Sequence, residues 1–243
     1  MDEQPDLVTG ISAVAVVVPA NDEEVLLPRC LTALAHAVAT LRAARPDVRV
    51  EVVVALDACT DGTAAVAARH GVHTTMVDAR CVGAARAAGA VAAHELLEVG
   101  ATHRAAGAWM ACTDADSVVP ADWLTGQVAA ADGGADLVLG RVRPDPLDLD
   151  GDTYREWSRR HTSAHPTRHV HGANLGVRWS AFAAVGGFAQ VPEHEDVLLV
   201  EALLAAGASV AAGPPILTSG RRAGRVPDGF SGYLRDLDAT LGR

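Results

Sequence analysis

The sequence contains no lysine, and all 20 of its basic residues are arginine. This absence excludes two kinds of chemistry. A P-loop needs a lysine for its phosphates, and Schiff-base or pyridoxal-phosphate catalysis needs a lysine amine. Arginine cannot replace that amine as a nucleophile, because its guanidinium group stays protonated. A phosphorylated ligand would therefore be held by arginine, by backbone N–H groups or through a metal ion.

Cysteines and long apolar runs are also scarce. Cys30, Cys59, Cys81 and Cys112 form no C-x-x-C pair, so their spacing supports neither a zinc ribbon nor a disulfide framework. The longest apolar run, Ile11–Val18, is too short to span a bilayer, and no signal peptide is visible. These features predict a soluble, cytoplasmic protein without a transmembrane segment.

The charge balance indicates the kind of partner. The formal net charge is −10, which argues against nucleic-acid binding, because that binding rests on basic side chains that neutralise phosphates. Apolar residues make up 49% of the chain but aromatic residues only 4%, so alanine and valine supply most of the core. Such a core suits helices packed closely on a sheet, and the expected partner is a small molecule.

Strand and helix patterns alternate along the first half of the chain. Strands are predicted at Ala13–Val18, Val50–Leu56, Val72–Val77, Trp109–Thr113 and Asp136–Gly140, and helices at Leu27–Leu41, Asp61–His70, Val82–Val99 and Ala121–Ala131. Further helices are predicted near Ser180–Val185 and Asp196–Ala206, whereas Tyr154–Arg168 reads as polar and irregular. Continuous apolar strands separated by helices imply βαβ crossovers and an α/β fold with a mainly parallel sheet.

Three polar clusters follow predicted strands of this sheet. They are Asn21–Glu24, Asp57–Gly62 and Asp114–Asp116. Ligands of open α/β sheets bind outside the carboxyl ends of the strands, so the three clusters are expected to converge on one site. Asp114 and Asp116 suit Mg²⁺ or Mn²⁺ shared with substrate phosphates. The alternative is an Asx turn that introduces the next helix.

Other candidate residues leave two interpretations open. Glu24 and Asp61 are better explained as first-turn and capping acids of helices. Arg86 is either a solvated charge or a nucleotide contact. Asp196 either caps a helix or acts as the general base that deprotonates an acceptor hydroxyl.

Histidines and arginines of the second half are ambiguous in the same way. Loop histidines are favoured over a zinc site, and a third ligand for an Asp-bound metal is the alternative role for one of them; they are His161, His165, His169, His171 and His194. Arg221 and Arg222, with Arg225, form a basic loop that either closes over a diphosphate or is a cationic tail without that role.

Taken in order, these segments resemble the family 2 glycosyltransferases of the GT-A fold. The matching segments are Val18–Glu24 (P-x-x-N-E-E), Leu56–Thr63 (D-D-G-S-T-D-G-T), Gly83–Gly89 (A-R-N-x-G), Thr113–Asp116 (D-x-D), Gly172–Asn174 (G-x-N), Gly186–Phe188 (G-G-F) and Glu195–Asp196 (E-D). The sequence departs from the pattern at Asp22, Asn21, Ala58-Cys59 and Ala87, which affects nucleobase recognition more than reaction class.

The resemblance implies an inverting, non-processive enzyme that uses a nucleoside diphosphate sugar and a divalent metal. UDP is favoured over GDP as the nucleotide, and the acceptor would be a small molecule, a lipid-linked molecule or a glycan. The resemblance also assigns roles to individual residues. The nucleotide would be lined by Pro19, Ala20, Glu23, Asp57, Arg86, Asp114 and Ala115; the metal would be bound by Asp116 with Asp114; the acceptor side would include Gly172, Asn174 and Glu195; Asp196 would be the catalytic base.

The same comparison predicts the domain organisation. Residues 1–243 would form a single GT-A-like domain, with a Rossmann-like nucleotide-sugar-binding half at 11–116 fused to an acceptor-binding and catalytic half at 117–243. Two other functions remain as alternatives: a sugar-phosphate nucleotidyltransferase and a non-catalytic nucleotide-sugar-binding protein. The nucleotidyltransferase usually has a glycine-rich basic loop where this chain has the acidic Asn21–Glu24.

Overall fold

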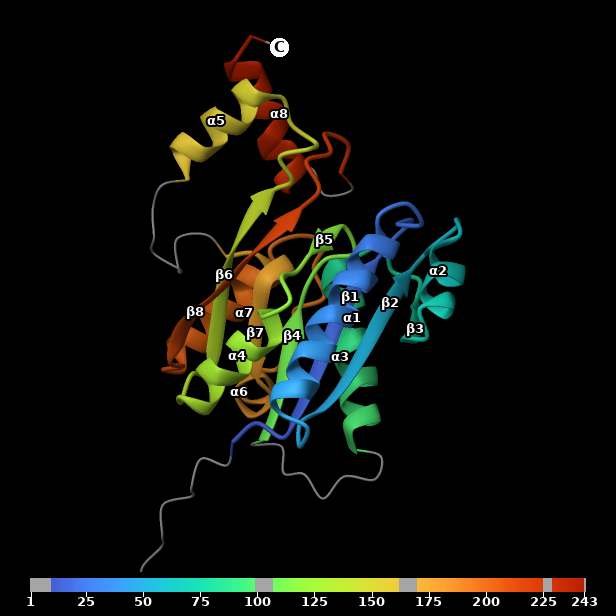
Figure 1. The fold of residues 1–243 in the computed structure, drawn as a ribbon, viewed down its shortest axis with the longest axis vertical. Helices are drawn as coiled ribbons and strands as arrows, with labels where there is room; N and C mark the ends of the chain where they lie inside the picture. The colour runs from blue at the N-terminus through green and yellow to red at the C-terminus, as the bar shows by residue number, and fades with distance from the viewer. Residues whose placement is uncertain (1–9, 99–106, 162–169, 225–228, 243) are drawn as a thin grey trace, which may run out of the picture.

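One mainly parallel sheet organises the fold. The computed structural model describes residues 10–98, 107–161, 170–224 and 229–242. Its strands are β1 (Ala13–Ala20), β2 (Arg49–Asp57), β3 (His73–Val77), β4 (Ala108–Cys112), β5 (Ser117–Val118), β6 (Leu137–Pro144), β7 (Leu175–Arg178) and β8 (Val210–Thr218). Within the described residues they form a single sheet in the order β3-β2-β1-β4-β7-β6-β8-β5 (Figure 1).

The direction of the strands agrees with the α/β prediction. β1 pairs in parallel with β2 and β4, and β2 with β3. β6 and β8 also pair in parallel, whereas β7 is antiparallel to both of its neighbours and β5 is antiparallel to β8. The carboxyl ends of β1, β2 and β4 therefore meet at one edge, and the predicted clusters follow these three strands.

Helices cover both faces of the sheet, as Figure 1 shows. They are α1 (Leu27–Ala44), α2 (Thr63–Arg69), α3 (Val82–Glu98), α4 (Trp123–Asp132), α5 (Gly151–Arg160), α6 (Trp179–Ala184), α7 (Glu195–Ala205) and α8 (Phe230–Thr240). Alternate residues of β1 face opposite ways: Val16 packs in the core with α1, α2 and α4, and Val17 in the core with α3, α6 and α7. α3 lies so close to β1 that a Cβ at Gly89 would stand 2.6 Å from Val17.

The structure corrects the prediction for the polar segment after β6. This segment contains α5, which begins where the Asp150 carboxylate accepts hydrogen bonds from the N–H groups of Asp152 and Thr153. α5 lies beside α8 (Figure 1). The two helices pack through a separate apolar cluster that includes Trp157 and Leu234. The helix escaped prediction because it has few apolar residues, and its partner α8 is distant in the sequence.

β8 was also missed, because it contains Pro214 and Pro215. The two prolines lie where the pairing of β6 with β8 shifts register, between Gly140 and Val142. Proline is tolerated at such an irregularity because it has no N–H group to donate there. Among the helices that the structure describes, none has the length and apolar character needed to cross a bilayer.

Candidate active site

Side chains of Asn21–Glu24, the segment after β1, hydrogen-bond to the loop after β2. The Asp22 carboxylate accepts a hydrogen bond of 2.6 Å from the N–H of Thr60, and the Glu24 carboxylate accepts one of 2.8 Å from the N–H of Gly62. The Asn21 amide donates to a backbone carbonyl at the end of β2. Three of the four side chains in this segment thus hold the loop after β1 against the loop after β2.

Asp57, at the end of β2, is held by the segment that leads into α3. Its carboxylate is 3% exposed and accepts hydrogen bonds from three consecutive backbone N–H groups, of Ala79 at 2.8 Å, Arg80 at 2.9 Å and Cys81 at 2.7 Å. A carboxylate has about four acceptor sites. Any contact of Asp57 with the nucleotide would therefore use the one acceptor site that these bonds leave.

Glu23, in the segment after β1, is paired with Arg221. The guanidinium group contacts both carboxylate oxygens of Glu23, at 2.7 and 3.0 Å. The Nη2 atom of Arg221, which makes the 2.7 Å contact with Glu23, also lies 3.0 Å from Oδ2 of Asp116. Arg221 therefore bridges the end of β1 and the segment after β4, which are far apart in the sequence.

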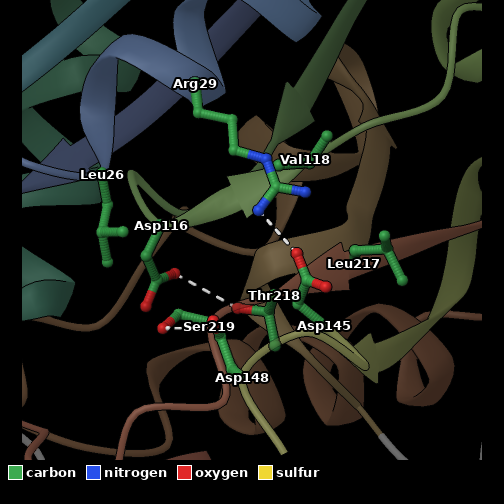
Figure 2. Close-up of a pocket in the computed structure, with 9 residues that line it drawn as sticks. All are labelled: Leu26, Arg29, Asp116, Val118, Asp145, Asp148, Leu217, Thr218 and Ser219. Atoms are coloured by element: carbon green, nitrogen blue, oxygen red, sulfur yellow. Dashed lines mark hydrogen bonds and ion pairs between the residues drawn. The ribbon is translucent and has the colours of Figure 1, made fainter.

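Asp116 is a largely buried carboxylate, with 13% of its side chain exposed. Thr218, at the end of β8, donates a hydrogen bond of 3.2 Å to its Oδ1 atom (Figure 2). Burial, together with the negative charge of Asp114, raises the pKa of Asp116 to about 6. The contact from Thr218 was not predicted, because β8 itself was not.

Arg86 is the second bridging arginine and is 3% exposed. Its Nη2 atom lies 2.5 Å from the carboxylate of Asp114, and its Nη1 atom pairs with the carboxylate of Glu195 at the start of α7. Burial by itself lowers the pKa of Arg86, but the charge of Asp114 and its neighbours outweighs it and raises the pKa. Arg86 thus joins the D-x-D segment to the E-D pair. It is buried, so the prediction of a solvated charge is wrong.

Gly172 makes room for this bridge, because a Cβ at that position would collide with the Arg86 guanidinium group. The N–H of Gly172 donates a hydrogen bond of 2.6 Å to Oδ2 of Asp196, and the N–H of Val197 donates to Oδ1 at 2.8 Å. The two bonds orient the Asp196 carboxylate at the N-terminus of α7. Arg86, Glu195, Gly172 and Asp196 therefore form one connected group.

Several predicted site residues have their side chains engaged elsewhere. Asn174 is 1% exposed; its amide donates to two backbone carbonyls and accepts from Trp123, so the side chain is not free to contact an acceptor. Ala115 is buried in the core. Arg222 pairs with Asp238 on α8 at 2.6 Å.

Pro19 and Ala20 are the last two residues of β1 and pair with β2.

A small cavity of about 40 Å³ is lined by Asp116 and by the Arg29–Asp145 ion pair (Figure 2). Its volume exceeds the roughly 10–15 Å³ that a single water molecule needs. The cavity is nevertheless too small to hold a sugar or a nucleobase.

The candidate histidines that the structure describes lie on three different segments of the chain. His161 stacks on Trp157, with ring centroids 4.7 Å apart, and lies between α5 and α8. His194 is exposed and adopts a positive φ of 64° just before α7. His171 precedes the short 3-10 turn Gly172–Asn174. His165 and His169 lie outside the described residues.

The balance of charge determines what these residues can bind. Among the residues that the structure describes, no group of three or more histidine, cysteine or acidic side chains is arranged to enclose a metal ion. The carboxylates nevertheless outnumber the guanidinium groups; the carboxylates are Glu23, Asp114, Asp116, Glu195 and Asp196, and the guanidinium groups are Arg86 and Arg221. This excess fits a divalent cation that takes one or two carboxylates and completes its coordination with phosphate oxygens.

Replacing Arg86 with methionine is expected to destabilise the protein by about 3–5 kcal/mol, because two carboxylates would lose a buried partner. For a chain of this size, each kcal/mol corresponds to roughly 2–4 °C in the midpoint of thermal unfolding. Thermal and urea unfolding measure the effect.

The control for this variant is Arg155→Met, which removes an exposed ion pair with Asp152. Such a pair contributes about 1 kcal/mol or less. Adding Glu195→Gln to Arg86→Met should restore part of the stability. An Arg86→Met protein as stable as the Arg155→Met protein would contradict a buried bridge.

Comparisons with known proteins agree with the fold and with the expected family. A family model described as glycosyl transferase family 2 matches residues 15–185, whereas a search of curated protein sequences finds no match. A similar solved structure is S. aureus TarS 1–349 in complex with UDP, with 17% sequence identity and a TM-score of 0.60. That match covers 94% of this chain and 64% of the TarS chain, so this chain spans less than two thirds of its length.

A second similar structure is glucosyl-3-phosphoglycerate synthase from Mycobacterium tuberculosis in complex with Mn²⁺, UDP and phosphoglyceric acid. The identity is 17%, the TM-score is 0.57, and the match covers 95% of this chain and 77% of that chain. At such identities the structural likeness supports the fold, and it agrees with the expected GT-A architecture. The family model, however, extends over more than half of the sequence, and the chain therefore belongs to glycosyl transferase family 2.

Proposed function

We propose that this protein transfers a sugar from a nucleoside diphosphate sugar to an acceptor hydroxyl by a single displacement that inverts the anomeric carbon. The observation that carries the proposal is the connected group at the carboxyl edge of the sheet. Arg86 pairs with Asp114 of the D-x-D segment, which also contains Asp116, and with Glu195, the neighbour of Asp196, so carboxylates of the two segments flank this arginine. A donor diphosphate and an acceptor hydroxyl need opposite sides of one site in such a reaction.

The carboxylates of the site would repel the negatively charged leaving diphosphate unless a positive charge is added. A divalent cation on Asp116, with help from Asp114, would supply a Lewis acid that neutralises the diphosphate without a proton donor. Arg221 offers a second positive group, since its planar fork matches phosphate oxygens. The excess of carboxylates over arginines supports a metal at this position.

Asp196 is assigned the proton transfer. As the acceptor oxygen bonds to the anomeric carbon, the bond from that carbon to the diphosphate oxygen breaks and the hydroxyl proton passes to the Asp196 carboxylate. The hydrogen bonds from the N–H groups of Gly172 and Val197 orient the carboxylate for this role. They leave lone pairs on its oxygens that can accept the proton.

The two halves of the chain would divide the substrates. Residues 11–116 are proposed to bind the nucleotide sugar, and residues 117–243 to bind the acceptor as parts of one domain. UDP is the favoured nucleotide, since TarS and the M. tuberculosis synthase were both crystallised with UDP. GDP is the competing choice, because the residues around Asp57 depart from the family pattern.

A thermal-shift screen tests the donor and the metal together. UDP with Mn²⁺ is expected to raise the midpoint of unfolding by several degrees, because a ligand at a hundred times its dissociation constant stabilises by about 2.7 kcal/mol. UDP alone and Mn²⁺ alone should produce much smaller shifts. GDP with Mn²⁺ is the matched comparison. A shift with GDP and none with UDP would reverse the nucleotide assignment, and the absence of a shift with either would contradict the proposed donor class.

A further inference from the structure

The segment after β8 places a positive side chain at the position proposed for the metal. Arg221 contacts Glu23 through both Nη atoms and Asp116 through Nη2. Its side chain is 30% exposed, whereas those of Glu23 and Asp116 are 7% and 13% exposed. The guanidinium group therefore covers two carboxylates from the solvent side.

We propose that Arg221 is an internal counter-ion that occupies the place of the divalent cation until a nucleoside diphosphate binds and that then moves onto the diphosphate. Metal binding thereby depends on nucleotide binding. The inference rests on the proposed function, because it takes the metal site from it.

Arg221 and a metal ion would compete for Asp116. Oδ1 of Asp116 accepts a hydrogen bond from Thr218, and Oδ2 faces Arg221 at 3.0 Å. A cation bound to Oδ2 at about 2.1 Å would lie no more than roughly 5 Å from the Nη2 atom, where like charges repel. Binding of a metal ion therefore becomes more favourable when the guanidinium group moves away.

The side chain can move while the backbone stays in place. The N–H of Ser219 donates to the backbone carbonyl of Asp116, and the N–H of Gly220 donates to the carboxylate of Asp148. These bonds hold the backbone of the segment beside the site, whereas the Arg221 guanidinium group is bound by side-chain carboxylates alone in the contacts described above. A diphosphate in the same site would offer that group phosphate oxygens in return.

Arg222 provides a contrast within the same segment. Its guanidinium group pairs with Asp238 and donates to the backbone carbonyl of Gly220. It therefore ties the segment to α8 and does not reach the site carboxylates. The two adjacent arginines have separate partners, so replacing each in turn distinguishes an exchange at Asp116 from a general loss of positive charge.

The exchange produces a measurable coupling between two ligands. In the native protein Mn²⁺ alone competes with Arg221 for Asp116, whereas bound UDP offers Arg221 phosphate oxygens as a new partner. UDP should therefore strengthen Mn²⁺ binding, and Mn²⁺ should strengthen UDP binding by the same factor. Allosteric couplings of this kind typically amount to about 5- to 150-fold.

The test measures Mn²⁺ affinity by electron paramagnetic resonance on the full chain, with and without UDP, for native protein, Arg221→Gln and the control Arg222→Gln. Arg221→Gln is expected to bind Mn²⁺ alone about five- to tenfold more tightly than native protein and to lose most of the strengthening by UDP. Arg222→Gln should behave as native. Thermal unfolding verifies that each variant folds, and Arg221→Met replaces Arg221→Gln if the latter does not.

Two results would overturn the exchange. One is unchanged or weaker binding of Mn²⁺ alone in the Arg221 variants. The other is tighter binding by the same factor with and without UDP, which would mean that Arg221 stays on the carboxylates and only repels the metal. Failure of the proposed function is distinguishable: it appears as the absence of sugar transfer, while the measurement with Mn²⁺ alone still reports on the exchange.

Discussion

Asp116→Asn is expected to reduce sugar transfer about a thousandfold or more while the protein stays folded. Asparagine has a similar shape but carries no charge, so it holds a divalent cation and its diphosphate poorly. Losing about 4 kcal/mol of charge stabilisation in the transition state corresponds to a thousandfold loss in rate. The measurement is release of UDP and formation of product from a UDP-sugar at saturating Mn²⁺, compared with the native protein.

The stability of the same variant should be unchanged or higher at neutral pH. The pKa of Asp116 is raised to about 6 in the folded protein, mainly by burial. An acid whose pKa is higher in the folded state binds more protons there, so its contribution favours folding less as the pH rises from about 4 to about 6. Asparagine removes this penalty above pH 6. Unfolding midpoints at pH 4.5 and pH 7 measure the difference.

The matched control for Asp116→Asn is Asp122→Asn, which changes an exposed carboxylate just before α4. It should transfer sugar at the native rate. Near-native transfer by Asp116→Asn would remove this residue from the proposed metal and diphosphate site. Circular dichroism shows whether Asp116→Asn is folded. If the variant is unfolded, Asp116→Ser replaces it in the transfer measurement.

Asp196→Asn is expected to lower kcat by about a hundred- to ten-thousandfold, the range that general-base catalysis contributes. The KM for the donor should change little, because the residue lies on the acceptor side of the group formed with Arg86 and Gly172. An asparagine oxygen can still accept the N–H of Gly172, so the start of α7 should keep its structure. Steady-state kinetics with varied donor and varied acceptor separates the two effects.

Glu201→Gln is the control on the same helix, because it changes an exposed acid of α7 away from the site. Native kinetics are expected for it. If Asp196→Asn also kept the native kcat, proton removal would have to be assigned to another group. If Asp196→Asn instead raised the donor KM with an unchanged kcat, Asp196 would be a donor-binding residue.

The order of helices and strands could be predicted because each of these elements carries its own local signal. β1 is a run of alanine and valine that ends in proline and alanine, and α1 repeats leucine and valine at helical spacing before Pro46. Such patterns depend only on neighbouring residues. α5, α8 and β8 lack them, because α5 and α8 gain their apolar contact from each other and β8 takes its place from pairing with β6.

Candidate residues of the site could be predicted from their position, but their contacts could not. Asp57 and Asp114–Asp116 were expected near one another because parallel strands end at one edge. Nothing in the local sequence indicated that the Asp57 carboxylate would be held by three backbone N–H groups, or that the Asn174 amide would be saturated inside the protein. These contacts come from segments that are remote in the sequence.

The amino-acid sequence by itself determined the α/β architecture, the absence of lysine chemistry and the set of carboxylates from which a metal or a base would be drawn. Only the tertiary structure decided how those carboxylates are neutralised: Arg86 by joining Asp114 to Glu195, and Arg221 by joining Glu23 to Asp116. The physical reason is that secondary structure depends on local periodicity, whereas an ion pair depends on distance in space. A fold can bring residues together that are 198 positions apart, as it does with Glu23 and Arg221.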